Sequence, residues 1–242
     1  MNMKEFNRHH IHASGYSPSV RQEILAGKLN QPDTSDYVGR REYTKRYRKS
    51  PKSNLENFMK IIYKIYYEEE LKAANLLQLE NEHNQIYGEF NIVFGNQYYL
   101  PYPTEETIGK NPEIFSELLL THFDQLNLVC ISLDEQVTNY VAIRYIESPW
   151  VWLEYKRVND RVFVSEIFHE DGGPNSYVSF EEEYFQRSKK EKIACIPLNE
   201  LLVEVTRKTN SFIEELQKIN PLLSESKAIK SFLSNTRRGD IP

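Results

Sequence analysis

The fold is decided by residues 137–168, which read VTNYVAIRYIESPWVWLEYKRVNDRVFVSEIF. Apolar side chains recur there at every second position, in runs over 137–145, 151–155 and 162–164. This alternation is typical of β-strands that turn one face to a core and the other to solvent. Residues 159–160, Asn-Asp, separate two of the runs and tolerate the positive φ of a tight hairpin turn. The stretch therefore predicts an antiparallel β-meander.

The residues after the meander predict two further strands and then helices. Short apolar runs over 177–180 and 193–196 are interpreted as strands. After Pro197, apolar residues from Leu201 to Ile219 follow helical spacing and predict an amphipathic helix. Asn220-Pro221 ends this helix and caps another one.

The residues before the meander predict a long helix and a hairpin. Ser53 and Glu56 have the spacing of a capping box, and apolar residues keep roughly helical spacing from Leu55 to about Leu79. This pattern predicts one helix over 53–79. Gly95-Asn96 then separates two strand-like runs, 86–94 and 97–100, and is a two-residue link of the type that closes a β-hairpin.

Two assignments complete the expected fold. Asn111-Pro112 has the residue types of a helix start and predicts a helix to about Phe123. The apolar run 126–133 is too short to distinguish strand from helix by its period, and it is interpreted as a strand. The predicted fold class is α+β: an antiparallel β-meander packed against amphipathic helices, preceded by a long helix and a β-hairpin.

The charge divides the chain into two parts. Residues 1–52 carry 11 Lys and Arg against 5 Asp and Glu, a net +6, whereas residues 53–242 carry 19 against 30, a net −11. The first part also has breakers and no sustained apolar period. We therefore expect a basic, largely irregular N-terminal arm over 1–52 and a single α+β domain over 53–242. The first residues lack a secretory apolar region and no long apolar run occurs, so a cytoplasmic protein without a membrane span is expected.

The arm contains the densest basic stretch of the chain. Residues 40–52 place seven cationic side chains and two tyrosines within thirteen residues. Arg and Lys neutralise phosphates and Tyr stacks on unpaired bases, so a nucleic acid is one candidate partner. An acidic protein, or the acidic remainder of the same chain, is the alternative partner. The candidate binding residues are Arg40, Arg41, Tyr43, Lys45, Arg46, Tyr47 and Arg48.

A second pattern suggests an enzyme. The apolar strand 151–156 contains Glu154 and Lys156 two positions apart, and Asp134 lies twenty residues upstream. This arrangement resembles the PD-(D/E)xK nuclease superfamily. The resemblance implies that Asp134 and Glu154 hold a divalent ion, that Lys156 positions the attacking water, and that Glu117 adds a ligand. The alternative is that Glu154 and Lys156 are simply the solvent-facing residues of a half-exposed strand.

A third pattern favours protein binding. Tyr140 and Arg144 share one face of the predicted meander. With Trp152 they are expected to line a groove for a protein partner, because Tyr, Trp and Arg dominate interface hot spots. An acidic α+β domain with a Trp-bearing meander is similar to immunity proteins that neutralise toxins. The favoured function is therefore a non-enzymatic binding protein of the bacterial cytoplasm, possessing no cofactor.

The remaining reactive residue types predict no metal site. His9, His10 and His12 are clustered, but neither Cys nor carboxylate follows at the spacing of a closed metal site. His122 and Asp124 are interpreted as a satisfied histidine near a carboxylate rather than as a catalytic pair. The two cysteines lie in apolar runs and are expected to be buried small hydrophobes; they are Cys130 and Cys195.

Overall fold

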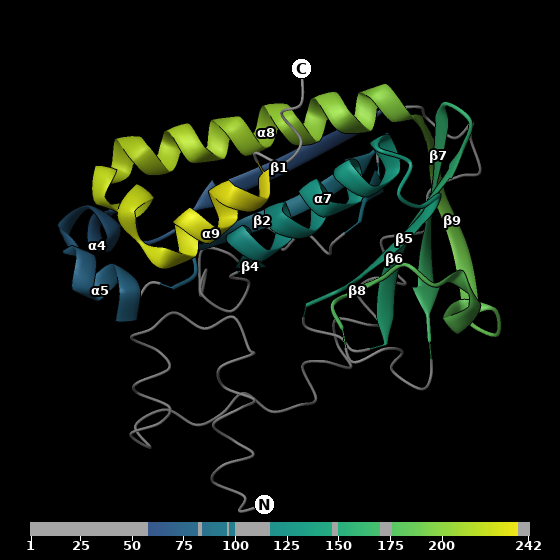
Figure 1. The fold of residues 1–242 in the computed structure, drawn as a ribbon, viewed down its shortest axis with the longest axis horizontal. Coiled ribbons are helices and arrows are strands. Elements are labelled where there is room, and N and C mark those ends of the chain that lie inside the picture. The colour runs from purple at the N-terminus through teal and green to yellow at the C-terminus, as the bar shows by residue number, and fades with distance from the viewer. Residues whose placement is uncertain are drawn as a thin grey trace, which may run out of the picture.

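The structure is a computed structural model of the 242-residue chain. It describes residues 58–81, 84–95, 97–99, 117–146, 150–169 and 176–236. The predicted arm over 1–52, the capping box at Ser53 and the helix start at Asn111 lie outside the described residues. Helix α8 runs along one side of the molecule, α7 and α9 lie beside it, and a five-stranded sheet stands at the opposite end from α4 and α5 (Figure 1).

The first sheet is antiparallel and is built around strand β2. It contains β1 (Met59–Ile65), β2 (Tyr87–Phe94), β3 (Gln97–Tyr98) and β4 (Glu117–Leu118), with β1, β3 and β4 all paired to β2. Strands β2 and β3 form the predicted hairpin, in which Phe94 pairs with Gln97. Gly95 takes a φ of 59° in the link, which glycine adopts without steric cost.

The predicted helix over 53–79 is wrong in its first half. Residues 59–65 form β1, and the helical part is limited to α4 (Glu68–Ala73) and α5 (Leu76–Asn81). The apolar residues of MKIIYKI fit a period of two as well as a helical period, and the run is rich in β-branched Ile. Pairing with β2 along all seven residues decides between the two periods. Tyr67, with a φ of 58°, then separates β1 from α4.

The second sheet confirms the predicted meander and its antiparallel pairing. Its strands are β5 (Tyr140–Arg144), β6 (Val151–Val158), β7 (Arg161–Phe168), β8 (Val178–Ser179) and β9 (Lys189–Pro197), in the order β8-β5-β6-β7-β9. Asn159 has a φ of 57° in the two-residue turn between β6 and β7, as expected from its side chain. Strand β9 begins four residues earlier than the predicted strand over 193–196.

The larger helices cover one side of both sheets. They are α7 (Leu119–Asp134), α8 (Leu198–Ile219) and α9 (Lys227–Thr236), with 3-10 helices η2 (Glu182–Phe185) and η3 (Pro221–Glu225). The prediction of a strand over 126–133 is wrong, because α7 is continuous through it and buries residues at helical spacing from Leu119 onwards. The amphipathic helix after Pro197 is confirmed. The Oδ1 of Asn220 accepts a hydrogen bond from the Leu222 N–H and caps η3.

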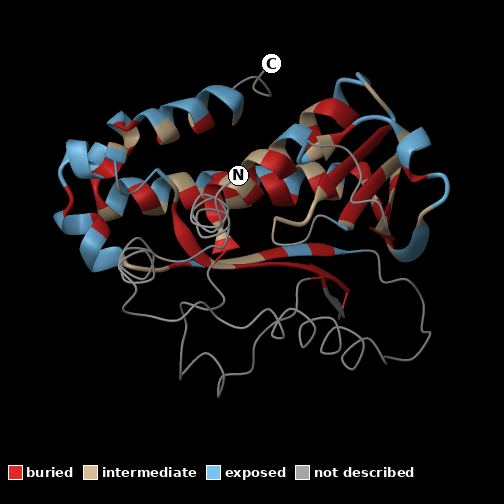
Figure 2. Cartoon of the chain, turned by 90° about the horizontal axis from the view of Figure 1, so that it is seen from below, coloured by how far each residue is buried: buried red, intermediate tan, exposed pale blue. Residues whose placement is uncertain are grey.

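The main core lies between the helices and the inner faces of the two sheets. Phe123 of α7 stacks on Phe212 of α8 with ring centroids 4.7 Å apart, and Tyr63 of β1 packs its edge against both. Buried residues concentrate on the strands and on the sides of the helices that face them (Figure 2). Cys130 is buried there as predicted, and burial raises the pKa of its thiol; Cys195 is only half-buried. Within the described ranges, no helix has the length and apolarity to cross a membrane.

Candidate functional site

The face of the five-stranded sheet that points away from the helices gathers most of the candidate residues. Side chains alternate along a strand, so the two faces of the meander carry different residues. Val141, Leu153 and Tyr155 point inward and belong to the main core. The cross-strand pairs Arg144–Trp152 and Ala142–Glu154 place their side chains on the other side, called here the outer face. The predicted residues on the outer face are Tyr140, Arg144, Trp152, Glu154 and Lys156.

A small second core covers the centre of the outer face. It consists of Tyr140, Ala142, Trp152, Ile167 and Phe185. Phe185 comes from η2, is fully buried, and lies with its ring centroid 5.0 Å from that of Trp152. Tyr140 and Trp152 are 5% and 0% exposed. The predicted open groove lined by these two side chains is therefore filled, and neither is available to a partner in this conformation.

The segment that covers the outer face, residues 176–188, is tied down by charge as well as by Phe185. Glu154 is 4% exposed and forms an ion pair with Lys190 of β9. Both oxygens of Glu182 in η2 accept hydrogen bonds from the Lys156 Nζ, at 2.7 and 2.8 Å. Burial, and then the carboxylates of Glu154 and Glu182, raise the pKa of Tyr140, so its hydroxyl stays protonated. This segment, called here the cover segment, is therefore packed against the outer face as part of the fold.

The acids of the nuclease interpretation are not brought together. Glu154 and Lys156 lie on the outer face, and each has a partner from another element. Asp134 ends α7 on the inner side of the sheet, where the Arg157 side chain contacts its carbonyl oxygen. Glu117 lies on β4 of the other sheet. No group of three or more His, Cys, Asp or Glu in the described part of the chain is placed to hold a metal ion.

Arg144 lies at the edge of the second core. Its guanidinium carbon is 4.2 Å from the centroid of the Tyr177 ring, a cation–π distance. Its Nε is buried and has no hydrogen-bond partner among the residues that the structure describes. Strand pairing explains the contact, because Tyr177 accepts the backbone N–H of Arg144 just before β8. Among the residues that the structure describes, Arg144 is thus held by an aromatic ring and not by an anionic side chain.

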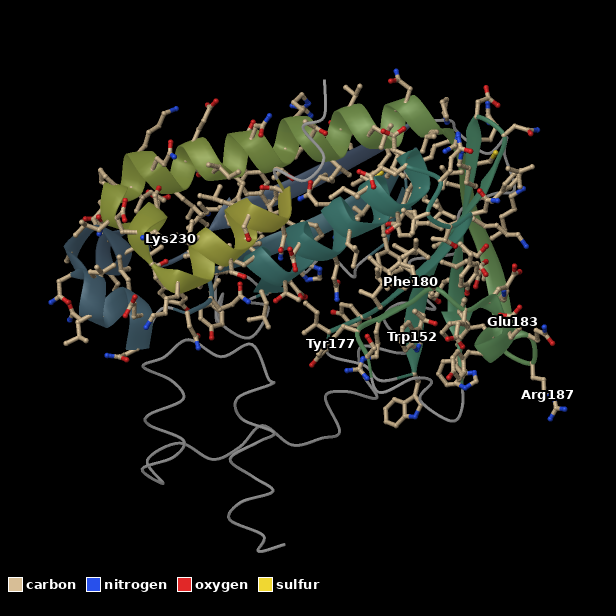
Figure 3. All side chains as sticks on the ribbon, in the orientation of Figure 1. Trp152, Tyr177, Phe180, Glu183, Arg187 and Lys230 are labelled. Atoms are coloured by element: carbon tan, nitrogen blue, oxygen red, sulfur yellow. The ribbon has the colours of Figure 1, made fainter. Side chains whose placement is uncertain are left out.

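Exposed aromatic side chains lie at the edge of the outer face. Trp150, Tyr177, Phe180 and Tyr184 are 48%, 43%, 46% and 51% exposed. Tyr177 and Phe180 lie near Trp152 at the same end of the sheet, and Glu183 lies on the same cover segment (Figure 3). A 3-10 helix has three residues per turn, so η2 directs Glu182 and Phe185 at the sheet and leaves Glu183 and Tyr184 outside. The sequence predicted the strand over 177–180, which β8 confirms, but it did not mark these residues as a site, although the run YVSFEEEYF over 177–185 is rich in aromatic and acidic residues.

A second polar cluster joins the two sheets. His122 Nε2 lies 3.0 Å from Oε2 of Glu117, and the Tyr145 hydroxyl donates to the other oxygen of Glu117 at 3.2 Å. Phe90 stacks on the His122 ring at 4.3 Å. His122 is a satisfied core histidine, as predicted, but its carboxylate is Glu117 and not Asp124. The adjoining cavity of about 20 Å³ is the size of one or two waters and is too small for a substrate.

The candidate residues of the basic arm, 40–48, lie outside the described residues. Comparison with known proteins finds no family model, no curated protein and no solved structure that matches this chain. The functional argument therefore depends on the geometry of the described residues.

Proposed function

We propose that this chain is a binding protein that recognises another protein through the outer face of its five-stranded sheet and the exposed aromatic side chains at the edge of that face. The observation that carries the proposal is the set of four exposed aromatic side chains at the edge of the outer face, one of which, Tyr177, holds Arg144. Tyr, Trp and Arg supply much of the binding energy at protein interfaces. Burying the exposed ring area against a partner contributes about 25 cal/mol per Å².

The outer face also provides a rigid support for these rings. The second core below them is fully packed, and the pairs of Glu182 with Lys156 and with Lys190 hold the cover segment on β6 and β9. A surface that is ordered before binding loses less conformational entropy when a partner docks. The buried residues Tyr140 and Trp152 would then act as supports for the contact surface.

This proposal specifies the binding role expected from the sequence. An immunity-type protein, which neutralises a toxin by covering part of it, is one form that such binding would take. Binding of nucleic acid through residues 40–48 is a separate prediction on a different part of the chain. The nuclease alternative is less favoured, because Asp134, Glu154 and Glu117 lie at three separate places.

The proposal is tested by affinity capture with the tagged full chain, in extracts of the cells that encode it. The variant carries Tyr177→Ser and Tyr184→Ser, which remove two exposed rings without opening the second core. The matched control is Leu77→Ser, because Leu77 is 69% exposed on α5 at the other end of the molecule. We expect a protein that the wild type and the control retain and the double variant loses, with affinity reduced by about 2 kcal/mol or more. Equal retention by all three chains, or no specific protein, would contradict the proposal.

A further inference from the structure

We infer that the partner presents a cationic segment, rich in Arg or Lys, to the outer face. This inference rests on the proposed protein-binding function and names the chemistry of the partner. The contact surface consists of Tyr177, Phe180, Glu181, Glu183 and Tyr184, and is called here the acidic-aromatic surface.

The outer face already holds cations of its own chain on aromatic rings. Arg144 lies over Tyr177 at 4.2 Å, Lys192 over Phe163 at 4.7 Å, and the Lys190 Nζ lies 5.8 Å from the centroid of the Tyr140 ring. A cation above an aromatic face is attracted by the negative charge of the ring face. The rings of this sheet are therefore arranged to accept cations from above.

The carboxylates of the cover segment differ in whether they are neutralised. Glu182 is paired with Lys156 and lies 4.0 Å from Lys190, so its charge is balanced within the fold. Glu181 and Glu183 on either side of it are exposed, and no cation among the described residues forms an ion pair with them. Two negative charges next to exposed rings therefore remain for a partner.

The position of the rings relative to these charges favours a guanidinium or ammonium group. Glu183 and Tyr184 are neighbours in the chain, and both are exposed on η2, away from its buried Phe185. A cation that stacks on the Tyr184 ring is then within reach of a carboxylate. Arg and Lys side chains combine these two interactions, whereas an apolar partner would bury the carboxylates without compensation.

The cations of this chain that lie near the acidic-aromatic surface do not make it favour an acidic partner. Arg144, Lys190 and Lys192 are engaged with the Tyr177 ring, with Glu154 and with the Phe163 ring. Arg187 extends outward at the opposite end of the cover segment from Tyr177 (Figure 3). An acidic or phosphorylated partner would meet Glu181 and Glu183 first and be repelled by them.

The test uses a fluorescent peptide of alternating arginine and serine, with a glutamate-serine peptide as its counterpart, titrated with the full chain and followed by anisotropy. The variant is Glu181→Gln with Glu183→Gln, which removes the two charges and keeps the shape. The control is Glu225→Gln, which removes an exposed glutamate that pairs with Lys230 at the far end of the molecule (Figure 3).

We expect the arginine peptide to bind the wild type and the control equally, and to bind the double variant about fivefold to thirtyfold more weakly. Equal binding of the arginine and glutamate peptides, or an unchanged affinity of the double variant, would overturn the inference. If the peptide fails while capture of a protein still depends on Tyr177 and Tyr184, only the cationic chemistry is refuted. If that capture fails as well, the proposed function is refuted with it.

Discussion

Replacing Glu204 by alanine should destabilise the fold through a strand that lies 143 residues away in the sequence. Oε1 of Glu204, on α8, accepts a hydrogen bond of 2.8 Å from the backbone N–H of Ile61. Among the described strands, β1 lies at the edge of its sheet, so this N–H points away from β2 and meets α8 in place of another described strand. Ile61 is fully buried and Glu204 is nearly so. The carboxylate therefore takes the place of a neighbouring strand.

The expected cost follows from what the substitution leaves unpaired. A hydrogen bond to a charged group, lost so that a buried N–H stays unsatisfied, costs about 1.5–3 kcal/mol. Arg207 also loses its ion pair, but it is more than half exposed, which limits that loss to about 0–1 kcal/mol. Alanine regains a few tenths of a kcal/mol of helix propensity, so the net loss is about 2–3 kcal/mol. Glu204→Gln keeps an acceptor for Ile61 and should lose about 1 kcal/mol.

Urea unfolding of the full chain, followed by circular dichroism, measures these differences. The control is Gln217→Ala, an exposed position on the same helix, which should change the free energy of unfolding by less than about 0.5 kcal/mol. A loss of 2–3 kcal/mol corresponds to a melting temperature about 4–12 °C lower for a chain of this size. The reasoning fails if Glu204→Ala behaves as the control does, or if Glu204→Gln is as damaging as Glu204→Ala.

Four further outcomes are expected. Asn220→Asp should lose about 2–4 kcal/mol in urea unfolding, because its amide donates to two buried carbonyl oxygens, of Leu71 and Ala74, that an aspartate would repel. Phe185→Ala should expose Trp152 to solvent. In a chain whose other tryptophan is replaced by phenylalanine, the fluorescence emission of Trp152 should then shift to longer wavelength and be quenched more strongly by acrylamide. Incubation with DNA or RNA and magnesium should leave the nucleic acid intact; cleavage that Glu154→Ala abolishes would restore the nuclease interpretation. A DNA gel shift that fades with salt and on deletion of residues 1–52 would establish nucleic-acid binding by the arm, and no shift at low salt would reject it.

The strands of the meander and helix α8 could be predicted because their signals are local. Alternation over 137–168 and helical spacing after Pro197 each fit one secondary structure only, and the turn at Asn159 has its own residue signature. Residues 59–65 fit two periods, and the choice between them depends on β2 and on Glu204 of α8. These partners are distant in sequence, so a reading of neighbouring residues could not find them.

The candidate site was predicted only in part, for a related physical reason. The period of the strands correctly placed Tyr140 and Arg144 on one face of the meander, and the same face receives Trp152. Their exposure could not be read from the strands, because it is set by Phe185 in a four-residue 3-10 helix that arrives later in the chain. Such a short element has no period to detect, and its contact with the sheet is purely tertiary.

The division of the five-stranded sheet into two faces links its fold to its proposed function. The inner face is continuous with the main core, so substitutions at Val141 or Tyr155 would act on the stability of the whole fold. The outer face needs only the small core around Phe185 to stay ordered. The exposed side chains at its edge are not part of that core, so they can vary without disturbing it. The exposed part of an aromatic ring adds nothing to the stability of a chain on its own, because it leaves apolar area in water. The concentration of such rings on the cover segment, next to carboxylates that form no ion pair with the described residues, is therefore the reason for proposing a partner with cationic side chains.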